Sequence, residues 1–201
     1  MSMLIEQLRI SLGTDLPPAT LDPELKLAAV LALLYPVGGE YKIVLTKRTS
    51  LVGSHRGEMC LPGGRFEPDV DHSLKETALR ESAEEIGLVS SNVEVLGSLE
   101  PRATRFGYLV SPYVGLLKLP QEFIAQPTEV DAIFEIPLAH LMAPDALSSE
   151  PRVYSGTQVS TPYFTYQDHV IWGATARILR QLLALLEPDA LAAPAGVGQR
   201  A

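Results

Sequence analysis

The sequence has very little cysteine: Cys60 is the single one among 201 residues. One cysteine excludes an intramolecular disulfide, which is typical of proteins from a reducing compartment. Long hydrophobic runs are also missing, because the longest uncharged apolar stretch, Leu27 to Tyr35, is far below the roughly 20 residues of a membrane span. The first residues contain no basic segment followed by an apolar one. We therefore expect a cytoplasmic protein without a membrane partner.

Basic residues are scarce as well: 16 Lys and Arg face 24 Asp and Glu, which gives a net charge of -8. This balance argues against nucleic acid as a partner, since nucleic-acid binding depends on basic surfaces that neutralise phosphates. Small anionic ligands remain compatible, because a bound cation and a few local arginines can hold phosphate groups. A length of 201 residues with 46% hydrophobic content predicts one globular domain.

Hydrophobic periodicity and turn residues divide the chain into an N-terminal helix and arm (1–27), one domain (28–187) and a disordered tail (188–201). The helix and arm could mediate a homodimer. The mixture of elements predicts an α/β or α+β domain. Residues 49–72 and 143–160 read as irregular. Helices are expected at 3–12, 74–86, 138–142 and 171–186, and strands at 28–35, 41–46, 93–99, 108–119, 130–136 and 162–166.

The helix expected at residues 74–86 has signals at both ends. Ser73 is a suitable N-cap residue, and Glu76 follows three residues later as its capping-box partner. Gly87 is a suitable C′ residue, because glycine adopts the left-handed conformation that ends many helices. These signals fix the register of the acidic residues that lie between them.

Three glutamates of this helix, Glu81, Glu84 and Glu85, are spaced at i, i+3 and i+4 and therefore share one face. Like charges at this spacing repel each other, and a divalent cation that prefers carboxylate oxygens would offset the repulsion. The alternative is a solvated acidic face with local ion pairs to Arg80. The tight glycine turn Gly63-Gly64 before the helix favours the metal-site interpretation.

The segment from Gly64 to Leu88 resembles the Nudix box, a glycine followed by five residues, a glutamate, seven residues and the pattern REUxEExGU. The second half is matched by RESAEEIGL, residues 80–88, with Ser82 in place of a bulky apolar residue. The first half departs, because His72 stands where the pattern has glutamate and Phe66 where it has glycine. The loop before the helix is two residues longer, and the role of the missing glutamate is unassigned.

This departure is similar to the coenzyme A pyrophosphatase subfamily, in which PGG precedes a longer loop and then TALRE. The chain reads LPGGRFEPDVDHSLKETALRESAEEIGL at residues 61–88. Upstream, LTKRTSLVGSHRGEMCLPGG (45–64) resembles the subfamily pattern LTxRSxxLxxHxGxxxFPGG. Downstream, QDHVIWGATARILR (167–180) resembles DHxIWGxTA at the start of its last helix.

The resemblance implies the Nudix fold, an α/β/α sandwich with a mixed sheet. It also implies a Mg²⁺ or Mn²⁺ cofactor held by Glu81, Glu84 and Glu85, with the Gly64 carbonyl as a further ligand. Arg80 would orient a glutamate through a charge-assisted pair. The general base is left open between a helix glutamate and a loop carboxylate, of which Glu129 is preferred, with His55 as another candidate.

The substrate implied is a nucleotide bound through its diphosphate. Candidate contacts lie in or beside the glycine-rich segment: Arg48, His55, Arg56, Gly63 and Arg65. The alternatives are surface charges for the arginines and a loop-ordering hydrogen bond for His55. We expect hydrolysis of coenzyme A or acyl-coenzyme A to 3′,5′-ADP and 4′-phosphopantetheine or its acyl form. Other possibilities are hydrolysis of ADP-ribose, NADH or a nucleoside triphosphate, or a non-catalytic nucleotide-binding module.

Overall fold

The computed structural model describes residues 3–14, 24–49, 57–118, 121–154 and 157–186. Its helices are α1 (Met3–Ser11), α2 (Leu74–Ile86), α3 (Leu138–Met142) and α4 (Gly173–Leu186), with a 3-10 turn at Ser90–Asn92. Its strands are β1 (Lys26–Val37), β2 (Glu40–Arg48), β3 (Met59–Cys60), β4 (Gly63–Arg65), β5 (Val93–Ser98), β6 (Arg102–Ala103), β7 (Tyr108–Leu117), β8 (Val130–Pro137), β9 (Leu147–Tyr154), β10 (Thr157–Tyr166) and β11 (His169–Ile171).

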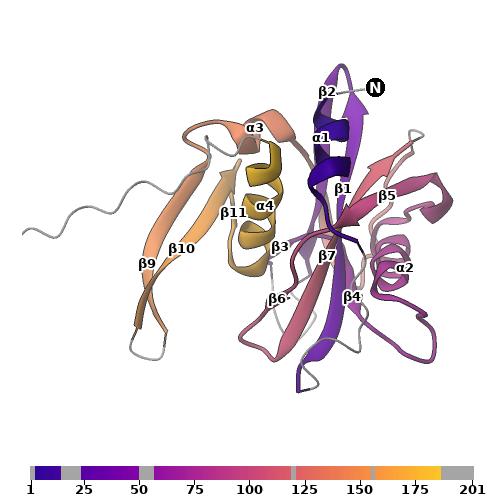
Figure 1. Cartoon of the computed structure of the whole chain (residues 1–201), viewed down its shortest axis with the longest axis horizontal. Coiled ribbons are helices and arrows are strands. Elements are labelled where there is room, and N and C mark those ends of the chain that lie inside the picture. Colours follow the sequence, from indigo (N-terminus) through magenta and orange to yellow (C-terminus); the bar gives the residue numbers. More distant parts are fainter. Residues whose placement is uncertain (1–2, 15–23, 50–56, 119–120, 155–156, 187–201) are drawn as a thin grey trace, which may run out of the picture.

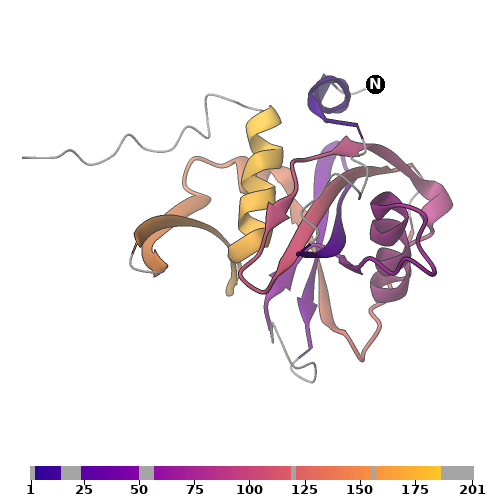
Figure 2. The same ribbon diagram turned by 60° about the horizontal axis from the view of Figure 1, so that its bottom comes forward.

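A mixed sheet forms the centre of the molecule. Its main order is β3-β2-β1-β7-β5, with β4 beside β1, β6 beside β7 and β8 beside β2. The pairing of β1 with β7 is parallel, and the other pairings in this sheet are antiparallel. Helix α2 covers one face, while α3 and α4 lie on the other (Figures 1 and 2). The predicted α/β/α arrangement with a mixed sheet is confirmed.

Strand β1 is buried on both of its faces, as its continuous apolar sequence indicates. Ala32 and Leu34 point into the core beneath α1, α3 and α4. Leu31 and Leu33 alternate with them and point into the core beneath α2. The two cores therefore share this strand, and the cavity described below lies against its N-terminal half.

Helix α2 has the bounds that its capping residues predict. The Ser73 hydroxyl accepts a hydrogen bond from the Glu76 backbone N–H at 3.2 Å. The Glu76 carboxylate accepts from the backbone N–H of His72 at 2.8 Å, one residue earlier than in a standard capping box. Gly87 ends the helix in the left-handed conformation with φ 66°, and its N–H donates to the Ala83 carbonyl. The helix cannot shift along its axis without losing these bonds.

Two of the predicted irregular regions contain strands, so those predictions are wrong. Residues 143–160, predicted to be a loop, contain β9 and the first four residues of β10, which pair as an antiparallel hairpin, and β11 joins them in a three-stranded sheet. Within 49–72, β3 pairs with β2 and β4 pairs with β1. In both regions pairing to a neighbouring strand outweighs a local sequence rich in turn-forming residues.

Helix α1 lies against α4 of the same chain. Ile5 and Leu8 are buried in the core, and the Gln7 side-chain amide donates to the Leu186 carbonyl at 3.1 Å. Its apolar side is thus covered within the chain, and a homodimer stays a prediction. Residues 15–23 of the predicted arm and the predicted tail at 188–201 lie outside the described residues. The helices that the structure describes are all too short or too polar to traverse a lipid bilayer.

Candidate active site

A cavity of about 690 Å³ lies where β4 and the middle of α2 meet the start of α4. Its floor is apolar and includes Ala28 and Val30 of β1, Val110 of β7 and Ile178 of α4. Charged side chains surround this floor on several elements, so the site combines an apolar centre with an ionic rim. The volume is within the range of ordinary small-molecule sites.

Glu81 lies directly against the glycine turn. A Cβ atom placed on Gly64 would fall far inside van der Waals contact with the Glu81 carboxylate. The carboxylate therefore occupies the space that the missing side chain leaves. Burial raises the pKa of Glu81, and the neighbouring Arg80 guanidinium partly offsets this effect. Glu81 and Gly64 both line the cavity.

Glu85 lies one turn further along α2 and is the more buried glutamate, with 4% of its side chain exposed. Its carboxylate accepts a hydrogen bond from the Gly63 backbone N–H at 3.2 Å and lies 3.6 Å from the Arg48 guanidinium. Burial raises the pKa of Glu85 to about 7, although Gly63 and Arg48 oppose the shift. Burying a carboxylate is unfavourable unless a positive charge compensates for it, and one arginine does so only in part.

Glu84 is placed differently from the other two glutamates. Its side chain is 60% exposed, and both carboxylate oxygens lie 3.3 Å from the Arg80 guanidinium. Glu84 is also not among the residues that line the cavity. The geometry therefore brings Glu81 and Glu85 together, while Glu84 as a metal ligand stays a prediction.

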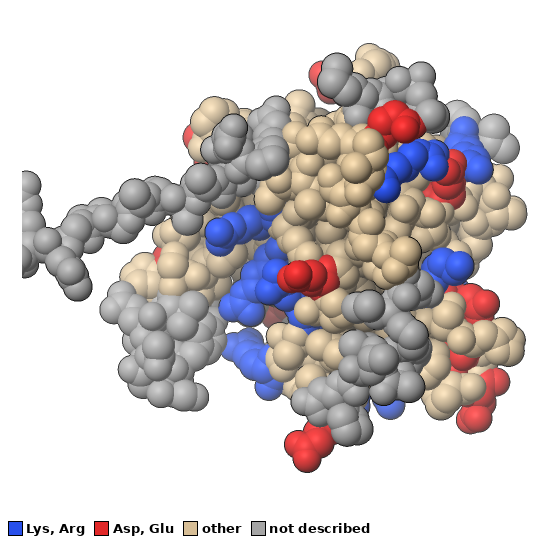
Figure 3. Space-filling view, in the orientation of Figure 1, with Lys and Arg blue, Asp and Glu red and all other residues tan. Residues whose placement is uncertain are grey.

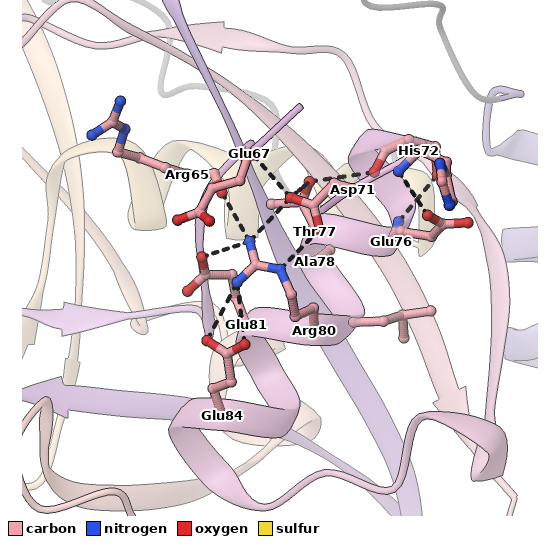
Figure 4. A network of polar contacts seen from close by, with 12 residues as sticks. Arg65, Glu67, Asp71, His72, Glu76, Thr77, Ala78, Arg80, Glu81 and Glu84 are labelled. Atoms are coloured by element: carbon pink, nitrogen blue, oxygen red, sulfur yellow. Dashed lines mark hydrogen bonds and ion pairs between the residues drawn. The ribbon is translucent and has the colours of Figure 1, made fainter. Parts of the chain in front are cut away.

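Arg80 is the centre of a polar network, with hydrogen bonds and ion pairs to the carboxylates around it (Figure 4). Its guanidinium donates to both oxygens of Asp71, at 2.8 and 3.0 Å. The same group reaches Glu81 at 3.0 Å and the Arg65 carbonyl at 3.1 Å. Arg80 thus contacts the Glu81 carboxylate directly, and its role in orienting that glutamate stays a prediction.

Asp71, one residue before the His72 that replaces the glutamate of the pattern, is the bidentate partner of Arg80. Only 2% of its side chain is exposed, and it also accepts from the Thr77 hydroxyl and the Glu67 N–H, both at 2.9 Å. The bond to Arg80 lowers the pKa of Asp71. The sequence did contain a signal for this residue, a carboxylate one position before His72. Counting residues back from Arg80 leads to His72 and therefore misses Asp71.

The donors present fit a divalent cation. Two carboxylates from successive turns of one helix line the same cavity, and a glycine turn lies open beside them. Within the described part of the chain, no group of three or more His, Cys, Asp or Glu gathers closely enough to enclose a metal. Mg²⁺ commonly binds through one or two carboxylates and completes its shell with waters and substrate phosphates. Glu81 and Glu85 would hold it here, with the Gly64 carbonyl as a further donor.

Several of the predicted substrate and base residues border this cavity. Arg48, Gly63, Arg65 and Glu129 line it. His55 and Arg56 lie outside the described residues, so their roles stay predictions. The opposite wall was not anticipated from the sequence, and it consists of Arg102, Arg105, Phe106, Tyr108, Trp172 and Arg177.

The two glycines of the turn should respond differently to alanine substitution. At Gly63, where φ is 146°, a Cβ would overlap the Ala29 carbonyl oxygen and the Val30 Cα. These are backbone atoms that cannot move aside, so we expect Gly63→Ala to destabilise the fold by about 2–4 kcal/mol. At Gly64 the overlap is with the movable Glu81 carboxylate. We therefore expect Gly64→Ala to fold nearly normally and to lose activity about 100-fold or more.

Urea unfolding and steady-state hydrolysis measured on both variants test this contrast. Gly38→Ala is a suitable control, because that glycine also has a positive φ but no atom lies near its Cβ position. A fully active Gly64→Ala protein would show that the Glu81 carboxylate can leave its place over the turn without consequence.

Comparison with known proteins identifies the family. Residues 25–156 match the model of the NUDIX domain. The chain is 38% identical over 176 residues to a protein from Photorhabdus laumondii described as uncharacterized Nudix hydrolase NudL, with 87% of this chain and 92% of that one covered. It is also 38% identical over 181 residues to Nudix hydrolase 15, mitochondrial, from Arabidopsis thaliana, covering 85% of this chain. It spans 63% of that protein's length.

Solved structures give a weaker likeness. The NUDIX domain of Shewanella oneidensis NrtR, crystallised with ADP-ribose, is 25% identical with a TM-score of 0.49, covering 63% of this chain and 81% of that one. A NUDIX hydrolase from Alicyclobacillus acidocaldarius is 15% identical with a TM-score of 0.49, covering 83% of this chain and 95% of that one.

The chain belongs to the Nudix family. It is a hydrolase that acts on pyrophosphate bonds, and hydrolases of this family generally use divalent metal ions such as Mg²⁺ or Mn²⁺. The identification agrees with a cavity in which Glu81 and Glu85 lie together over a glycine turn.

Proposed function

We propose that this protein hydrolyses the diphosphate of coenzyme A or acyl-coenzyme A to 3′,5′-ADP and 4′-phosphopantetheine or its acyl form. One observation carries the substrate assignment. The two stretches that resemble the coenzyme A pyrophosphatase subfamily are far apart in sequence, yet both contribute to one cavity. Gly63 and Gly64 come from the first stretch, and Trp172, Gly173 and Thr175 come from the second.

Hydrolysis requires attack of water on a phosphorus atom and stabilisation of the negative charge that develops on the phosphoryl oxygens. A divalent ion, when bound, neutralises that charge and makes water a better nucleophile at neutral pH. Glu81 and Glu85 supply the carboxylates for the ion, and Arg80 keeps Glu81 oriented at 3.0 Å. Arg48, 3.6 Å from Glu85, and Arg65 lie at the cavity, where they can contact the diphosphate.

Glu129 is the side chain best placed to accept a proton from water. It lines the cavity and is exposed to solvent there. Its backbone is fixed on both sides, because its N–H donates to the Gln126 carbonyl and its own carbonyl accepts from Thr49, each at 3.0 Å. An exposed carboxylate held at the edge of the site by a rigid backbone can meet a water that approaches the bound diphosphate.

The substrate assignment is tested by comparing coenzyme A, acetyl-coenzyme A and ADP-ribose with Mg²⁺ and with Mn²⁺. We expect kcat/KM for coenzyme A to exceed that for ADP-ribose at least 10-fold, with 3′,5′-ADP as a product. Addition of EDTA should abolish turnover, since the carboxylates alone do not supply the positive charge. Cleavage of ADP-ribose, NADH or a nucleoside triphosphate with coenzyme A left intact would replace this assignment by another nucleotide substrate.

A non-catalytic nucleotide-binding role is the remaining alternative. It would leave every one of these compounds intact while the protein still bound one of them. The buried Glu85 argues against this role, because a protein that only binds an anion gains nothing from a second carboxylate beside the ligand.

A further inference from the structure

The wall of the cavity opposite the glutamates is basic and aromatic. Three arginines line it: Arg102 on β6, Arg105 in the loop between β6 and β7, and Arg177 on α4. In Figure 3, Lys and Arg side chains gather along a hollow over the lower end of α4 and β6. In a chain with a net charge of -8, such a gathering marks a place where a negative charge is expected to bind.

The arginines of this wall are available to a ligand. All three are exposed, and the structure gives neither Arg105 nor Arg177 a carboxylate partner within the described residues. Arg102 approaches Glu100 at 3.6 Å, but that carboxylate is 81% exposed and the pair is therefore weak. By contrast, Arg48 and Arg80 are already engaged with carboxylates on the α2 side.

Aromatic rings accompany the arginines. The Arg105 guanidinium carbon lies 4.7 Å from the centre of the Phe106 ring and 5.7 Å from the centre of the Trp172 ring. Phe106 is 48% exposed and, like Trp172, lines the cavity. A flat base can stack on such rings while the guanidinium groups bind an anion attached to the same ligand.

The strand register gives the separation between the two ends of the cavity. Arg102 pairs with Val110, Val110 with Ala28, and Ala28 with Arg65, so these four positions form a row across β6, β7, β1 and β4. Three strand spacings make this row about 14 Å long. Arg65 and Arg102 both line the cavity, one at each end of this row. The cavity therefore offers positive charge at two places that one extended nucleotide can reach together.

From this arrangement we infer a second anion subsite, formed by Arg102, Arg105 and Arg177 with the rings of Phe106 and Trp172. It binds a phosphomonoester carried on the ribose of the nucleotide, in addition to the diphosphate held near Glu81. The inference rests on the proposed hydrolysis of a nucleotide diphosphate and specifies which end of the substrate is recognised. It predicts preference for a substrate with an extra phosphate over the same substrate without it.

Paired substrates measure this preference directly. Coenzyme A and 3′-dephospho-coenzyme A differ only in a 3′-phosphate, and NADPH and NADH differ only in a 2′-phosphate. We expect the wild-type protein to favour the phosphorylated member of at least one pair at least 10-fold in kcat/KM. The pair that shows the preference identifies the ribose position. Equal rates within both pairs would overturn the inference.

Substitution of the arginines tests whether this wall causes the preference for the phosphorylated substrate. Arg105→Gln and Arg177→Gln should each reduce kcat/KM for the phosphorylated substrate about 10-fold, because a charge-assisted hydrogen bond is lost. For the dephosphorylated partner the change should stay within about twofold. Arg180→Gln is the matched control, since Arg180 lies on α4 outside the cavity and should change neither rate. Equal losses on both substrates would also overturn the assignment.

A binding measurement separates this inference from the proposed hydrolysis. Calorimetry without metal should show that adenosine 3′,5′-bisphosphate, or the 2′,5′-isomer, binds at least 10-fold more tightly than AMP, and that Arg177→Gln removes the difference. If coenzyme A is not hydrolysed but this preference is present, the subsite stands and the substrate assignment fails. If coenzyme A is hydrolysed and neither bisphosphate binds more tightly than AMP, the subsite fails alone.

Discussion

Replacement of Glu85 by glutamine is expected to lower kcat by at least 1,000-fold while the protein stays folded. Glu85 is the most buried of the helix glutamates, and its carboxylate is held by Gly63 and Arg48 at the cavity. Glutamine keeps the shape and can still accept the hydrogen bond from Gly63, but it has no negative charge for a cation. A loss of several kcal/mol of charge stabilisation corresponds to a rate loss on the order of a thousandfold.

Glu84→Gln is the matched control for this experiment. It removes the same charge from the same helix, but at a side chain that is 60% exposed and turned toward Arg80. We expect a loss of about 10-fold or less. Steady-state hydrolysis over a range of Mg²⁺ concentrations measures both variants, and circular dichroism checks their folding. An equal, large loss in both would support the prediction that Glu84 is a third metal ligand, and an unchanged Glu85→Gln rate would remove Glu85 from the reaction.

Replacement of Asp71 by alanine is expected to destabilise the protein by about 3 kcal/mol, the lower end of the range for breaking a buried ion pair, because Arg80 keeps some contact with solvent. The variant leaves the Arg80 guanidinium, which is 20% exposed, without its bidentate partner. The Thr77 hydroxyl and the Glu67 N–H lose an acceptor as well. Urea unfolding at neutral pH measures the difference.

Asp69→Ala is the control, since Asp69 is an exposed carboxylate of the same loop and should change stability by less than about 0.5 kcal/mol. Acid supplies a second check. Because Arg80 lowers the pKa of Asp71, its contribution is present above the pKa of an unfolded aspartate, about 3.9, and is lost as the pH falls toward the lowered folded-state value. The gap between wild type and Asp71→Ala should therefore close in acid. A gap that persists there would mean that packing, not the ion pair, accounts for it.

Local signals in the sequence were sufficient to predict the bounds of helix α2 and to identify the family. The caps at Ser73 and Gly87 gave its bounds, and the helical repeat placed Glu81 and Glu85 one turn apart. The apolar run at 28–35 likewise predicted a strand, which the structure contains within β1. Each of these features depends on residues within a few positions of one another, where periodicity and capping chemistry apply directly.

Features that depend on contacts between distant segments were missed. Asp71 lies nine residues from Arg80, and only the path of the loop brings the two side chains together. Residue counting assumes a fixed loop length, and the longer loop here shifts the acidic residue out of the expected position. The wall of Arg105 and Trp172 joins elements more than 60 residues apart in sequence, and no spacing rule applies at such separations.

Strand β1 has a practical consequence for future ligand searches. It supplies residues to both cores and, through Ala28 and Val30, to the floor of the cavity. Separating the layers would expose both faces of this strand at once, so the domain should melt in a single cooperative transition. A compound bound at the cavity would then raise the free energy of unfolding of the whole domain, by about 2.7 kcal/mol at a concentration 100 times its Kd. The Tm of the domain would rise accordingly. Thermal-shift screening can therefore find nucleotides that bind but are not cleaved.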